Sequence, residues 1–103
     1  MILALAIMAL ALPASGQLRS TEVALNLGNV LGSEKGCDLK FNQKAIEDYI
    51  DKNVQANDMG FTSMLNMMTK VMASDLRKMG DSQKTAHCAQ IRRVARANKF
   101  ISD

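Results

Sequence analysis

The sequence predicts an all-α fold: a small domain of three to four helices, stapled by one disulfide bond, after a cleavable signal peptide. Three observations support this prediction. The chain opens on an apolar run that ends in small residues. It holds two cysteines about 50 residues apart, and its second half repeats apolar residues every three or four positions. A domain of this length has a marginal core, so covalent reinforcement is expected.

Residues 1–16, MILALAIMALALPASG, have the features of a secretory signal peptide. The apolar run is too short to span a bilayer, and Ala14 and Gly16 suit positions −3 and −1 of a cleavage before Gln17. The run lacks the Lys or Arg of a typical n-region. Either the first residue of the protein is assigned too late in the sequence, or the signal is a weak one. A short buried helix or a membrane anchor is the alternative. We expect an exported chain, periplasmic or secreted.

Cys37 and Cys88 are expected to pair, because two cysteines in an exported chain most simply form one disulfide. The chain-entropy model gives a loop of this length a stabilisation of roughly 4 kcal/mol. A pair of free thiols, or one cysteine bonded to another molecule, is the alternative. A lipid anchor on Cys37 does not fit, because the charged residues Glu34 and Lys35 stand shortly before it.

Residues 17–36 predict a loosely structured N-terminal segment that contains a short helix. Val23 and Leu27 fit one helical face, but they also fit the alternation of a strand. Gly28 weakens either assignment, and Gly32 is a suitable end for the helix. A loop then leads to Cys37.

Residues 37–103 are expected to form the helical domain, with helices at about 43–54, 60–79 and 83–98. Asn42 is suited to cap the first helix, where Phe41 and Ile46 can form a hydrophobic staple. The last residues, Phe100 and Ile101, are expected to fold back on the core.

The turn between the second and third of these helices predicts how they pack. Asn57 or Asp58 is expected to cap the second helix, and Gly80 is placed to end it at C′. Asp81 or Ser82 is then expected to cap the third. Because the connection is short, the sequence predicts that these two helices form an antiparallel hairpin.

Six of the eight methionines fall between Met59 and Met79. Most complete the apolar stripe of the second helix, so core packing accounts for them first. We expect Met59 and Met67 outside the core. A thioether-lined helix face also suits varied apolar partners, and clustered thioethers bind Cu(I) outside the cytoplasm. The residues predicted for the apolar binding face are Met59, Met64, Met67 and Met68.

The last helix predicts a basic surface, because no acid lies between Asp81 and Asp103. Such a surface suits an anionic lipid, a cell-wall polymer or an acidic protein, and a solvated helix face is the plain alternative. Nucleic acid is not expected, since no base-stacking aromatic residues accompany the charge. The residues of this surface are Arg92, Arg93, Arg96 and Lys99.

No catalytic residues, metal ligands or cofactor are predicted, so we do not expect an enzyme. His87, the only histidine, adjoins Cys88, but neighbouring residues on a helix do not face each other. It is expected to be a surface or boundary residue. Glu47 and Asp51 share a helix face that is expected to be exposed, with no pocket residues around it.

The layout of helices and two spaced cysteines resembles the small helical chaperones of the bacterial periplasm that protect proteins during acid stress. The likeness is one of layout without a shared motif, so no functional residue is carried over. We expect a small exported binding protein that uses its Met-rich face and its basic helix, with a protein partner or self-association. The alternatives are a periplasmic Cu(I)-binding protein and a periplasmic stress chaperone. A membrane contact is expected only through an uncleaved leader.

Overall fold

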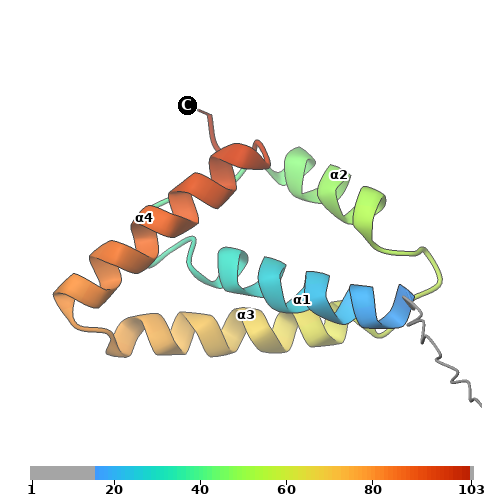
Figure 1. Ribbon diagram of the computed structural model, residues 1–103, viewed down its shortest axis with the longest axis horizontal. Coiled ribbons are helices and arrows are strands. Elements are labelled where there is room, and N and C mark those ends of the chain that lie inside the picture. Colours follow the sequence, from blue (N-terminus) through green and yellow to red (C-terminus); the bar gives the residue numbers. More distant parts are fainter. Residues whose placement is uncertain (1–15, 103) are drawn as a thin grey trace, which may run out of the picture.

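The computed structural model describes residues 16–102, which form four helices (Figure 1). In chain order these are α1 (Gly16–Gly32), α2 (Gln43–Asn53), α3 (Phe61–Lys78) and α4 (Asp81–Ala97). α1 is central: α3 runs along one side of it, and α2 and α4 lie on another side (Figure 1). The all-α prediction is confirmed. None of the helices in the described part of the chain is long and apolar enough to cross a membrane. The predicted signal peptide lies outside these residues, apart from Gly16.

A row of small residues on α1 sets its close contact with α3. Ser20, Ala24, Gly28 and Gly32 recur at every fourth position and therefore share one face of the helix. A Cβ atom added to Gly28 would lie 2.6 Å from the Cβ of Met68. Such a distance is sterically forbidden, so the two helices pack more closely than any side chain at Gly28 would allow.

The helix expected within residues 17–36 is present and ends at Gly32 as predicted, but the segment is not loosely structured. The segment contains a regular helix of 17 residues, which is the main partner of α3. The glycines that weaken an isolated helix are here the points at which a second helix fits against it. Their cost in helix propensity is offset by the packing that they permit.

A second side of α1 builds the main core with α4 and the first turns of α3, and half-buried residues of α2 pack against this core. Phe100 lies near the middle of this core, with its ring centroid 5.8 Å from those of both Phe41 and Tyr49. The expected folding back of the C-terminal residues is thus confirmed. The buried members of the core are Val23, Ala24, Leu27, Val30, Phe41, Phe61, Leu65, Ile91, Ala95 and Phe100.

The antiparallel hairpin predicted for α3 and α4 does not form. The two helices diverge from the turn at Met79 and Gly80, because α3 packs along α1 instead (Figure 1). Gly80 does not adopt the left-handed conformation of a C′ glycine. It has φ −73° and serves as the N-cap of α4, where its N–H donates to Oε1 of Gln83 at 3.3 Å. A short turn alone does not bring two helices together when another helix occupies the apolar side of one.

The helix ends agree with the predicted ranges to within two residues. Asn42 caps α2 as expected, since its Oδ1 accepts from the N–H of Ala45 at 3.0 Å. The N-cap of α3 is Gly60 and not Asn57 or Asp58. Asp58 contributes its backbone carbonyl there, which accepts from the N–H of Phe61 at 3.4 Å.

α4 ends in a Schellman motif that places Lys99 in the left-handed region. The N–H of Phe100 donates to the carbonyl of Ala95 at 2.8 Å, and the N–H of Lys99 donates to that of Arg96 at 3.0 Å. Lys99 has φ 64° as a result. This conformation is unfavourable for a residue with a Cβ atom and is normally taken by glycine.

Lys99→Gly is therefore expected to raise the free energy of unfolding by about 1 kcal/mol. Urea unfolding followed by circular dichroism measures the change. Lys99→Ala is the matched control, because it removes the same charge but keeps the Cβ atom, and it should change stability little. Equal stabilities of the two variants would contradict the strain assigned to this position.

Candidate functional site

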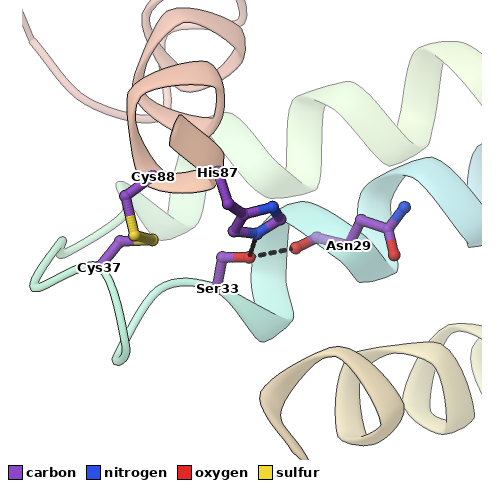
Figure 2. The surroundings of a disulfide bond; sticks show 5 residues. All are labelled: Asn29, Ser33, Cys37, His87 and Cys88. Carbon is purple, nitrogen blue, oxygen red and sulfur yellow. Dashed lines mark hydrogen bonds between the residues drawn. A yellow bond between two sulfur atoms is a disulfide. The ribbon is translucent and has the colours of Figure 1, made fainter. Parts of the chain in front are cut away.

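The disulfide between Cys37 and Cys88 joins the loop after α1 to the middle of α4 (Figure 2). The Cα atoms of the two residues lie 5.4 Å apart, and both side chains are buried. Together with Leu76 they form a second, smaller core cluster. The predicted intramolecular bond is confirmed. Since a cysteine in a disulfide is no nucleophile, both residues serve the fold here.

A short chain of hydrogen bonds lies beside the disulfide (Figure 2). The Ser33 hydroxyl donates to the carbonyl of Asn29 at 2.7 Å, and the same oxygen lies 2.7 Å from Nε2 of His87. A carbonyl only accepts, so it takes the single hydroxyl proton. Nε2 of His87 must then carry a proton and donate to Ser33.

This arrangement of Ser33 and His87 is structural and not that of a catalytic pair. A general base for serine would have to accept the hydroxyl proton, whereas here the imidazole donates. Ser33 is also 0% exposed, so its oxygen is shielded from solvent. His87 is half-buried, in line with the boundary position expected for it. The bond ties α4 to the end of α1.

The four methionines of the predicted apolar face divide into two exposed and two half-buried residues. Met59 is 85% exposed in the loop before α3, and Met67 is 52% exposed on the helix, as the sequence predicts. Met64 packs against the main core, and Met68 lies against Gly28 of α1. The structure thus places three of the four on α3 and leaves Met59 apart from them.

One side of α3 forms a continuous apolar strip, which we call the α3 ridge. Val71, which is 44% exposed, follows Met67 by one helical turn. Met64 and Met68 border these two residues at spacings of three and four positions. Val71 was not among the residues predicted for the apolar binding face, although its spacing of four positions from Met67 places both on one side of the helix. The ridge consists of Met64, Met67, Met68 and Val71.

Of the four predicted basic residues, the structure brings two together. Arg96 and Lys99 line a surface cavity of about 660 Å³, which they share with Lys40 from the loop before α2. Arg92 is half-buried and does not line this cavity. Arg93 is exposed elsewhere on α4, where it donates to Gln90 at 3.5 Å. No pattern in the sequence links Lys40 to α4, because only the fold places them side by side.

Two of the three acidic side chains of α2 pair with a lysine. The side chain of Lys44 lies 2.8 Å from Asp48 and 3.7 Å from Glu47. The hydrogen bond to Asp48 raises the pKa of Lys44 above its ordinary value. These groups are exposed, so they contribute little to stability. Within the part of the chain that the structure describes, no three His, Cys, Asp or Glu side chains are placed to hold a metal ion.

Comparison with protein-family models, with curated proteins and with solved structures finds no match to this chain. The likeness to the periplasmic acid-stress chaperones therefore stays one of layout. Among the described residues, the α3 ridge and the basic cavity are the surface features that suggest a function.

Proposed function

We propose that this chain is an exported, non-enzymatic binding protein that holds an apolar segment of another polypeptide against the α3 ridge. The observation that carries the proposal is the exposure of Met67 and Val71, at 52% and 44%, beside the side of α3 that packs against α1. Single exposed apolar residues are common on protein surfaces. Two exposed residues that continue into the half-buried Met64 and Met68 form a contiguous apolar surface, which is typical of an interaction site.

The composition of the ridge supports an adaptable partner surface. Three of its four side chains are methionines, whose flexible thioethers fit apolar groups of varied shape. Exposed polar residues flank the strip, including Asn66 and Lys70. An apolar centre with a polar border is the usual arrangement of a protein-binding surface.

Two further observations support export. The leader at residues 1–16 has the composition of a secretory signal. Disulfides persist mainly in oxidising compartments, and Cys37 and Cys88 are joined by one. A stress chaperone could use the same ridge to bind an apolar segment of an unfolded protein. Suppression of the aggregation of such a protein would identify that role.

The double variant Met67→Ser/Val71→Ser tests the proposal. A fluorescent peptide rich in Leu and Phe should bind the unaltered protein, and the variant should bind it about tenfold more weakly because two apolar contacts are lost. Fluorescence anisotropy measures both affinities. Met59→Ser is the control, because it removes an exposed thioether outside the ridge and should leave the affinity unchanged. Equal affinities of the double variant and the unaltered protein would reject the ridge as the binding surface.

Cu(I) binding is a second candidate, which the neighbouring positions of Met64, Met67 and Met68 on one side of α3 favour. Met67→Leu separates the two functions, since it keeps an apolar side chain and removes the sulfur. Peptide binding should survive this substitution. A loss of Cu(I) affinity in competition with a chelator would favour the metal instead.

A further inference from the structure

The cavity where the C-terminal end of α4 meets the start of α2 is lined by positively charged side chains. Three cations line it, Lys40, Arg96 and Lys99, and among the residues that the structure describes none of the lining residues is acidic. The ion pairs found among residues 20–102 lie within α2 and involve none of these three. Like charges that line one cavity repel each other, so an anion that enters the cavity is favoured.

The helix α2 begins at the same cavity, so the free N–H groups of its first turn lie close to it. Its N-cap, Asn42, lines the cavity and is fixed to the end of the chain by an N–H bond of 2.7 Å to the carbonyl of Phe100. The Asn42 side chain accepts a hydrogen bond from the N–H of Ala45. The N–H groups of Gln43 and Lys44 lack an intrahelical partner, as in any first turn, and they stand at the positive end of the helix dipole.

The charge and the lining of the cavity favour a phosphate group over other anions. A single carboxylate balances one of the three cations, whereas a phosphate dianion balances two. Its several oxygens can accept from a guanidinium, from an ammonium and from helix N–H groups together. Phe41 and Phe100 also line the cavity, but they are only 3% and 1% exposed. Their rings are thus not available to stack on a nucleobase, which disfavours nucleic acid.

We propose that this cavity binds a phosphate group, carried either by a small phosphorylated molecule or by a lipid headgroup. Lys40, Arg96 and Lys99 supply the charge, and the first turn of α2 supplies backbone donors. None of these residues belongs to the α3 ridge. The phosphate site therefore does not depend on the proposed peptide binding, and each can fail without the other.

Titration of the protein with inorganic phosphate and with glycerol 3-phosphate, followed by NMR, tests the site. The amide signals of Gln43 and Lys44 should shift saturably, and glycerol, which lacks the phosphate, should leave them in place. Arg96→Gln should weaken the binding about fivefold to tenfold, because one charge-assisted hydrogen bond is lost. Arg93→Gln is the matched control, since it removes the same charge from α4 outside the cavity and should change the affinity less than twofold. Circular dichroism checks that both variants keep the helical fold.

Vesicles distinguish the two sources of the phosphate group. Binding to phosphatidylglycerol vesicles that free phosphate reverses would assign a lipid headgroup. Binding of the soluble phosphates without vesicle binding would assign a small molecule. The proposal is overturned if no saturable shift is seen, or if Arg93→Gln weakens binding as much as Arg96→Gln. Vesicle binding that free phosphate does not reduce would overturn it as well, because the contact would then lie elsewhere.

Discussion

Opening the disulfide between Cys37 and Cys88 is expected to lower the free energy of unfolding by about 4 kcal/mol. The two cysteines stand 51 positions apart, so the bond removes a large share of the conformational freedom of the unfolded chain. A small domain often has a total stability of only about 5 kcal/mol. The reduced protein should therefore be close to unfolding at room temperature. Urea unfolding with and without a reductant measures the difference.

A variant without thiols separates this effect from other actions of the reductant. Cys37→Ala/Cys88→Ala should be destabilised like the reduced protein and should not respond to the reductant. Mass spectrometry of the untreated protein should give a mass two hydrogens below that of the dithiol form. A loss below about 1 kcal/mol on reduction would show that the bond adds little to the packing of its cluster.

Gly28→Ala and Gly32→Ala are each expected to lower the free energy of unfolding by about 1–3 kcal/mol. Helix propensity alone predicts the opposite sign, a gain of about 1 kcal/mol. The packing decides the outcome, because an added Cβ at Gly28 would meet the Cβ of Met68 at 2.6 Å. One at Gly32 would meet the Cβ of Met72 at 2.8 Å. α1 and α3 would have to move apart, with loss of contacts along both helices.

Gly80→Ala is the matched control for these two substitutions. An added Cβ at Gly80 has no atom within 4 Å, and the φ of −73° suits alanine. Because alanine is a poorer N-cap than glycine, this variant should lower the free energy of unfolding slightly, by less than about 1 kcal/mol. Thermal unfolding of the three variants gives the comparison. A gain in stability for Gly28→Ala would show that helix propensity outweighs the contact with α3.

The helices with a clear apolar periodicity could be predicted from the sequence. α2, α3 and α4 combine apolar periodicity with recognisable ends, so their bounds were found to within two residues. The end of α1 at Gly32 was predicted, but its firm packing was underestimated, because Gly28 lowers the helix propensity of the segment. The spacing of four between Gly28 and Gly32, together with Ala24 and Ser20, indicates a close helix contact once a partner is considered. The absence of a hairpin between α3 and α4 depended on that same contact and could not be predicted without it.

In the candidate sites too, local features could be predicted from the sequence, whereas contacts between distant residues could not. The disulfide and the exposure of Met59 and Met67 follow from composition and helical spacing, and both were predicted. The bond between Ser33 and His87, and the position of Lys40 beside α4, join residues far apart in the chain. No local pattern encodes such contacts, since they exist only after the helices have packed.

The central helix α1 lies outside the covalent loop that the two cysteines close, whereas its partner α3 lies inside. In the reduced chain, about 40 residues separate Gly32 from the position of Met72 that it contacts. In the oxidised chain, the connection through Cys37 and Cys88 is about half as long. The free-energy cost of bringing the two positions together is therefore lower by about 0.6 kcal/mol. We therefore expect the oxidised chain to bring α1 against α3 faster than the reduced chain does. The disulfide is then expected to affect how quickly the core forms as well as how stable it is.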